Sequence, residues 1–213
     1  MPLSAPHARS AAITRAIICT AYRRDDMRWD IEGHLTDTRH HDLIAMGGYP
    51  IRAGDHVHDM WVRLTLSDEM VIEAVEAVMD AAPWTICPAA LGPIDTLVGI
   101  SIGRGFTKAV TEPIGGTLGC THIREMLGRM ANVAMQAAAA GSMTGFTDAG
   151  DLDRARAAAV RQLVGTCHSF ESTREIIQQL APDAFNGAPD PDENDRQRGL
   201  RLRSAMQPLT TED

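Results

Sequence analysis

Residues 54–66 read GDHVHDMWVRLTL, and from position 60 onward Met, Val, Leu and Leu recur at every second residue. This spacing predicts a half-buried β-strand, whose successive side chains point to opposite faces. His56 and His58 would then share the face of these apolar residues. Two imidazoles would therefore point into the core or a cavity, where titratable groups need partners and where their pKa values shift.

Two earlier segments are also predicted strands. Residues 13–22, ITRAIICTAY, are rich in β-branched side chains, and residues 27–37, MRWDIEGHLTD, alternate cleanly. In the second segment Trp29 would face the core side, whereas Glu32 and His34 would share the opposite face.

Residues 67–82 are open to two interpretations. SDEM could close a hairpin before another strand, or Ser67 could cap a helix that has Asp68 and Glu69 in its first turn. The sequence leaves both open.

The clearest helical pattern lies within residues 115–140. GGTLGCT leads in, Thr121 is the expected N-cap, and apolar residues recur at helical spacing after it. Shorter patterns predict three further helices, over residues 104–112, 151–164 and 171–181. The first of these should end before Pro113.

Because the predicted strands come first and the helices follow, we expect an α+β fold. A curved antiparallel sheet would form in the N-terminal half, and helices from the C-terminal half would pack on it. We expect residues 1–12 to be a mobile N-terminus, residues 13–181 a single catalytic domain, and residues 182–213, which are polar and rich in Pro and Gly, a largely flexible tail.

Composition excludes several classes of function. The net charge of −8 argues against a nucleic-acid partner. The chain has neither a run of about 18 apolar residues nor a recognisable secretory signal, so we expect a cytoplasmic protein without a membrane partner. Its four cysteines should be reduced there. The sequence contains no CxxC pair, so a zinc knuckle is not indicated. The motifs for NAD, FAD and ATP, and the G-x-S-x-G elbow, are absent from the sequence.

Two groups of residues are candidates for catalysis. Cys120 and His122 would lie at the entrance of the long helix, where the positive end of the dipole favours a thiolate and a neutral imidazole. His58, Glu32 and Asp37 would come from the strands, as a base or a residue that orients one.

Further residues are candidates for ligand binding. Substrate contacts are predicted for Arg23, Asp25, Trp29, His56 and Trp61. We expect no metal, but zinc is possible, and its ligands would then be His58, His122 and Cys120.

Several segments resemble the bacterial domain of unknown function 2889 family. They are YRRDDMRWDIEGHLTDT at 22–38, HDMWVRLTL at 58–66, the CP pair at 87–88, GGTLGCTHIREML at 115–127 and the CH pair at 167–168. The resemblance covers roughly residues 20–170. Arg39 stands where lysine is usual and Trp84 where tyrosine is usual, and neither departure removes a candidate catalytic group.

The resemblance implies a catabolic enzyme for a small aromatic substrate, because family members tend to occur beside genes for degrading lignin-derived compounds. We therefore expect a lyase without an organic cofactor, which removes water or formaldehyde from a hydroxylated side chain of a phenolic. The alternatives are a metal-dependent hydrolase or hydratase of aromatic compounds and a non-enzymatic aromatic-binding accessory protein. A homo-oligomer is expected for a catabolic enzyme.

Overall fold

The computed structural model describes residues 4–5, 7–141 and 148–187. These residues form two compact units, one that ends at Ala138 and one that begins at Ala139. Each unit is described by itself. The expected bounds of a single domain over 13–181 stay a prediction.

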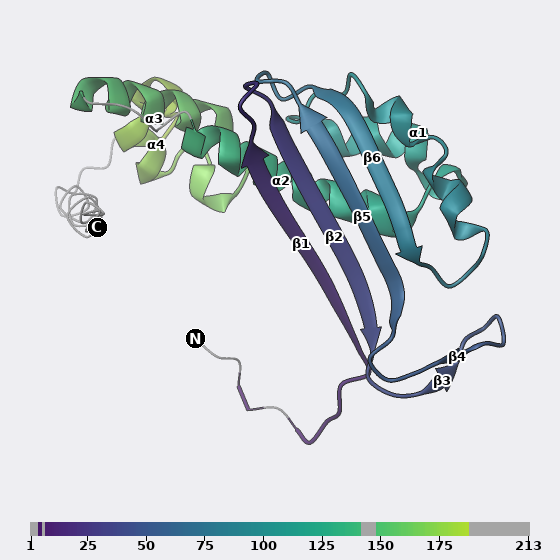
Figure 1. Ribbon diagram of the computed structural model, residues 1–213. Helices are drawn as coiled ribbons and strands as arrows, with labels where there is room; N and C mark the ends of the chain where they lie inside the picture. The colour runs from purple at the N-terminus through teal and green to yellow at the C-terminus, as the bar shows by residue number, and fades with distance from the viewer. Residues whose placement is uncertain (1–3, 6, 142–147, 188–213) are drawn as a thin grey trace, which may run out of the picture. The chain divides into compact units, whose positions relative to one another are not determined.

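A four-stranded antiparallel sheet forms the first unit's frame (Figure 1). Its strands, in spatial order, are β1 (Ile13–Arg23), β2 (Trp29–Arg39), β5 (His56–Leu66) and β6 (Ile72–Ala81). In the sequence, β2 and β5 are joined by the short strands β3 (Leu43–Ile44) and β4 (Pro50–Ile51), which form a separate two-stranded sheet.

The segment 67–82 is a hairpin turn followed by a strand. The Ser67 hydroxyl accepts hydrogen bonds from the backbone N–H groups of Glu69 and Val71. Met70 takes a left-handed conformation with φ of 62°, and its N–H donates to the Ser67 carbonyl over 3.1 Å. Ser67 therefore closes a turn, which decides between the two interpretations in favour of the strand.

The helices of the first unit follow the sheet in the sequence. They are the 3₁₀ turns η1 (Cys87–Leu91), η2 (Ile94–Leu97) and η3 (Gly116–Leu118), and the helices α1 (Phe106–Ile114) and α2 (Thr121–Gly141). The expectation that the first helix ends before Pro113 is wrong, because α1 contains Pro113 in its last turn. The apolar residues of α1 lie at positions 106, 110 and 114, one turn apart, and all are buried, so packing outweighs the local preference.

The second unit is helical. It contains α3 (Ala149–Leu163), η4 (His168–Phe170), α4 (Glu175–Leu180) and η5 (Pro182–Ala184). The Asp148 side chain caps α3 by accepting hydrogen bonds from the N–H groups of Gly150 and Asp151. A small core of Val160, Ile177 and Ala181 holds these helices together. The predicted tail begins within η5, and residues 188–213 lie outside the described chain.

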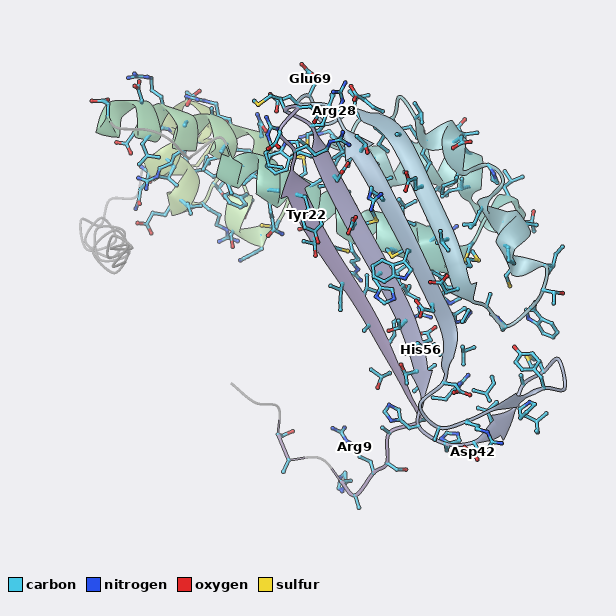
Figure 2. All side chains as sticks on the ribbon, in the orientation of Figure 1. Arg9, Tyr22, Arg28, Asp42, His56 and Glu69 are labelled. Atoms are coloured by element: carbon cyan, nitrogen blue, oxygen red, sulfur yellow. The ribbon has the colours of Figure 1, made fainter. Side chains whose placement is uncertain are left out.

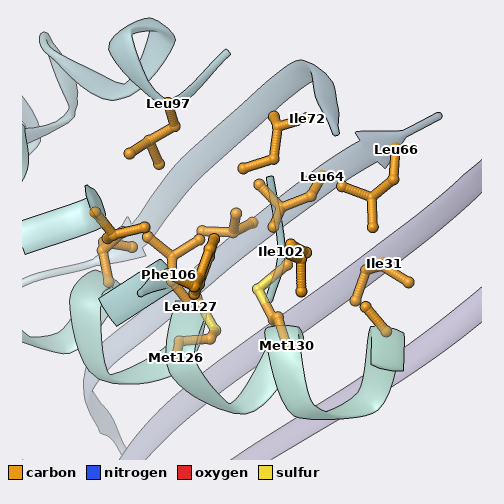
Figure 3. Close-up of a cluster of buried hydrophobic side chains, with 14 of the residues drawn as sticks. Ile31, Leu64, Leu66, Ile72, Leu97, Ile102, Phe106, Met126, Leu127 and Met130 are labelled. Carbon is orange, nitrogen blue, oxygen red and sulfur yellow. The ribbon is translucent and has the colours of Figure 1, made fainter. Parts of the chain in front are cut away.

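The main core lies between one face of the sheet and the helices α1 and α2 (Figure 3). The buried residues shown there include Ile31, Leu64 and Leu66 of the sheet, Phe106 of α1, and Met126, Leu127 and Met130 of α2. Strands in the N-terminal half and helices after them confirm the predicted α+β class.

Gly33 allows α2 to lie close to the sheet. A Cβ atom at this position would lie 2.7 Å from the sulfur of Met130 and 2.8 Å from Cγ of Met126. Both distances are shorter than a carbon atom tolerates, so the absence of a side chain on β2 sets the distance between helix and sheet.

Gly33→Val should therefore destabilise the protein by about 1–3 kcal/mol, since the two methionines would have to move in a packed core. Gly128→Ala is the matched control, because a Cβ at that exposed position of α2 meets nothing within 4 Å. This control should stabilise the protein by up to about 1 kcal/mol. Urea unfolding of both variants measures the difference, and a Gly33→Val variant as stable as the wild type would contradict the close approach.

Candidate functional site

Asp37 is the centre of the site. It continues the core-facing series of β2 that includes Ile31 and Leu35, and only 1% of its surface is exposed. In the register of the sheet, Arg15 of β1 and His58 of β5 are its direct neighbours on either side. Directly opposed residues of antiparallel strands point to the same face, so the three side chains meet there.

Both oxygens of the Asp37 carboxylate are occupied. The Arg15 guanidinium donates from Nε to Oδ1 over 2.8 Å and from Nη2 to Oδ2 over 2.7 Å. His58 Nδ1 lies 2.7 Å from Oδ2. Because an ionised carboxylate only accepts, His58 carries its proton on Nδ1 in this hydrogen bond.

His122 completes the site from the first turn of α2. Its ring centre lies 3.9 Å from that of His58, with the two planes tilted by 36°. Its Nε2 lies 3.9 Å from Oδ2 of Asp37, and its Nδ1 lies 3.7 Å from Sγ of Cys120. The side chains of His58 and His122 remain 14% and 22% exposed, so solvent reaches both rings.

Two residues of this cluster were not found from the sequence. Arg15 donates from Nη1 to Glu125 of α2 over 2.8 Å, in addition to its two bonds to Asp37. A signal for Arg15 was present, because it shares a strand face with Ile17 and Cys19, and a charged residue on such a face needs a buried partner. Glu125 follows His122 by three residues, the spacing of neighbours on one helix surface.

Charge and burial set the protonation states. Burial acts to raise the pKa of Asp37, but the hydrogen bonds from Arg15 and His58 outweigh it and hold this pKa below its ordinary value. Burial lowers the pKa of His122, and the nearby charges of His58 and Arg15 lower it further. Near neutral pH the site therefore holds an ionised carboxylate and a neutral imidazole at His122.

His56 does not belong to this group, and the expectation that it shares a face with His58 is wrong. The pairing of β2 with β5 shifts between Asp37 and Thr38, so that Thr38 is opposite His56 and Val57 is skipped. His56 Nδ1 lies 3.0 Å from the Thr38 hydroxyl, at an exposed position. A bulge of this kind interrupts the alternation on which the prediction depended.

Glu32 and Trp61 lie on the other face of the sheet. Glu32 accepts a hydrogen bond from Arg63 over 2.8 Å, and Trp61 stacks on His34. The structure therefore separates Glu32 from Asp37, with which it was grouped as a catalytic candidate. The cause is the alternation of β2, which sends positions 32 and 37 to opposite faces.

Arg23, Asp25 and Trp29 lie at the far end of the sheet. Arg23 stacks over the Trp29 ring at 4.8 Å and pairs with Asp68, and Asp25 is in the exposed turn between β1 and β2. Eight residues of extended strand separate Trp29 from Asp37, which is about 27 Å. The structure therefore places these three residues apart from Asp37, and their contact with a substrate stays a prediction.

Among the described residues, Asp37, His58 and His122 offer ligand atoms within 4.8 Å of one another, and these three could approach a metal ion. Cys120 approaches this group at His122, with its Sγ 3.7 Å from Nδ1 of that ring. The guanidinium of Arg15 already donates to both Asp37 oxygens, and a cation there would have to displace it or lie beside its charge.

This geometry defines an α+β protein in which a carboxylate orients one histidine beside a second histidine, between a sheet and a helix. The model of the family described as protein of unknown function (DUF2889) matches residues 13–136. The chain therefore belongs to this family. The match includes all four strands of the sheet and every residue of the cluster.

Neither the curated proteins nor the solved structures contain a match to the chain. Among the described residues, no helix is both long and apolar enough to cross a membrane.

Because the pKa of His122 is lowered in the folded protein, the free energy of unfolding should depend on pH. Below about pH 6.5 the unfolded chain binds a proton at this histidine that the folded chain resists, so stability should fall as the pH drops. Above that pH neither state is protonated, and the effect vanishes. We expect His122→Gln to lose less stability than the wild type between about pH 6.5 and pH 5 in urea unfolding.

The control for this measurement is His41→Gln, because His41 is an exposed histidine between β2 and β3. It should keep the wild-type dependence of stability on pH. An unchanged dependence in His122→Gln would contradict the assignment.

Proposed function

We propose that the protein is an acid–base enzyme of the lyase type, without an organic cofactor, which acts on a small lignin-derived phenolic. The observation that supports it best is His58, which is hydrogen-bonded to buried Asp37 and lies 3.9 Å from His122 ring to ring. Two imidazoles in contact, both reached by solvent, can divide the work of taking and returning a proton.

Asp37 orients the base in this proposal. Its carboxylate holds the proton of His58 on Nδ1, which leaves Nε2 with a free lone pair. The bond also stabilises the imidazolium that forms when Nε2 takes a proton, as in other carboxylate–histidine pairs. Arg15 keeps Asp37 ionised, so the carboxylate does not take the proton itself.

His122 is the second proton carrier. Burial and the charges of His58 and Arg15 lower its pKa, so this ring is neutral before the reaction and can accept the proton that His58 takes from the substrate. His58 then acts as the base, and His122 acts as the acid once it has received this proton and can return it to the leaving group. Cys120, 3.7 Å from Nδ1 of His122, is assigned the role of positioning that ring.

A phenolic substrate explains why no cofactor is required. The base takes the phenol proton, the bond from the side chain to its hydroxyl breaks, and the hydroxide leaves as water with the proton of the acid. The electron pair of the phenolate moves into the ring, which becomes a quinone methide. Loss of a proton from the next carbon gives an alkene; loss of a terminal hydroxyl proton with cleavage of the carbon–carbon bond gives the alkene and formaldehyde instead.

Substitution of the two histidines tests the proposal. On a substrate that the wild type turns over, His58→Gln and His122→Gln should each reduce kcat by about 10²–10⁴-fold. Circular dichroism should show an intact fold, and the exposed control His41→Gln should keep full activity. The substrates are lignin-derived dimers and hydroxycinnamates, with loss of water or formaldehyde read by mass. Full activity in both site variants would overturn the assignment, and tight binding without any turnover would favour the accessory-protein alternative.

A metal-dependent hydrolase or hydratase is the second candidate, because Asp37, His58 and His122 bring three ligand groups together, one carboxylate and two imidazoles. The Arg15 guanidinium on Asp37 makes it the weaker one. Metal analysis of untagged protein separates the two: less than about 0.1 equivalent with activity retained would exclude metal catalysis. Stoichiometric zinc or iron, with activity abolished by a chelator, would support it.

A further inference from the structure

The face of the sheet opposite α1 and α2 carries an apolar row that crosses all four strands. In the register, Ile18 of β1 is opposite His34, His34 is opposite Trp61, and Trp61 is opposite Val78 of β6. Ile18, Trp61 and Val78 are 62%, 42% and 51% exposed. Within the first unit, the helices lie behind the sheet in Figure 1, and Tyr22, labelled in Figure 2, is a further exposed aromatic of β1.

The centre of this row is already ordered. The His34 ring lies parallel to the Trp61 ring, at 3.6 Å between centres and 8° between planes. Asp59 fixes the other side of the same imidazole through a bond of 2.7 Å to Nε2. Side chains held in this way lose little further freedom on binding, and tryptophan is the residue most enriched at the energetic centre of protein interfaces.

The charges beside the row are paired within the face, with two carboxylates sharing one guanidinium. Arg63 pairs with Glu32 at 2.7 Å on one side and with Glu76 at 3.1 Å on the other. These three residues follow one another in the register from β2 to β6, one row away from Trp61. A partner can therefore cover the face without leaving one of these charges unpaired.

The arrangement is complementary to itself. A two-fold axis parallel to the strands, between β2 and β5, exchanges β1 with β6 and β2 with β5. Ile18 would then face Val78 of the second copy, and Glu32 would face Arg63 of the second copy. Apolar groups would meet apolar groups, and the acid would meet the guanidinium.

From these observations we propose that the open face of the sheet is the interface of a homodimer. Eleven-residue strands are about 36 Å long and four of them are about 19 Å wide, so the face offers roughly 700 Å² of area per copy. This approaches the area of about 800 Å² per partner that a stable interface buries. Aligned packing of two such faces is the common arrangement of sheets in β-sandwiches.

Sedimentation of the full chain over a range of concentrations tests the proposal. We expect a dimer in the wild type, and Val78→Glu and Trp61→Glu should each raise its dissociation constant at least about 100-fold, because an unpaired charge would be buried. Ile86→Glu and Trp84→Ser are the matched controls, since both residues are exposed apolar side chains outside the sheet face. They should leave the dissociation constant within about threefold of the wild type, the range usual for near-neutral positions.

A crosslink tests the geometry. Ile18→Cys and Val78→Cys in one chain, with exposed Cys167 changed to Ser, place two thiols about 14 Å apart within a copy, too far for an internal disulfide. Across the proposed axis they are opposed, at about the 10 Å that separates packed sheets. A short bis-maleimide, which bridges that gap but not the separation within one copy, should therefore give a covalent dimer from the double variant and not from either single variant.

Three outcomes would overturn the proposal: a monomer at every concentration, a dimer unaffected by Val78→Glu and Trp61→Glu, or equal loss of the dimer in the two controls. A covalent dimer from Ile18→Cys alone would overturn the axis. A monomer at every concentration is also the result expected if another part of the same chain, or a small ligand, occupies the face.

Discussion

The constraint on which this structure depends is one ionised carboxylate that has no access to water. An uncompensated charge in the position of Asp37 would cost several kcal/mol. The chain compensates it with a guanidinium from β1 and an imidazole from β5, its two neighbours in the sheet. Because Arg15 also binds Glu125, the same network reaches α2. The residues that would perform catalysis therefore also fix how three strands and a helix meet.

The way α2 packs on the sheet depends on the spacing of its residues. His122, Met126 and Met130 are four residues apart, and residues at this spacing lie on one face of a helix. Met126 and Met130 pack over Gly33, where the sheet has no side chain to hold the helix away. His122 is then carried one turn further, to the position of His58. A glycine in the middle of the sheet thus determines how closely two imidazoles approach at its end.

Local periodicity was sufficient to predict β1, β2, β5, the long helix and the α+β class, because each depends on side chains within a few residues of one another. It left β6 open, since the turn at Ser67 is what decides for a strand. The alternation of β2 also places Asp37 on the face of Leu35, and that of β5 places His58 on the face of Met60. The approach of His122 was beyond prediction, since it depends on packing between segments about 60 residues apart. His56 was misplaced because the bulge opposite Asp37 leaves no local signal in the sequence. Arg23 and Trp29 lie apart from Asp37 because an extended strand separates residues close in sequence by the length of the sheet.

The hydrogen bonds of Asp37 and the exposed apolar row around Trp61 lie on opposite faces of the same sheet. Asp37 and His58 turn toward the helices, whereas Glu32 and Trp61 turn away from them. Alternation alone imposes this, so a residue on one face shares a backbone with the other face but no side-chain contact. A charge introduced at Val78 would alter the association surface without touching the hydrogen bonds of Asp37. The acid–base proposal and the dimer proposal can therefore succeed or fail independently of each other.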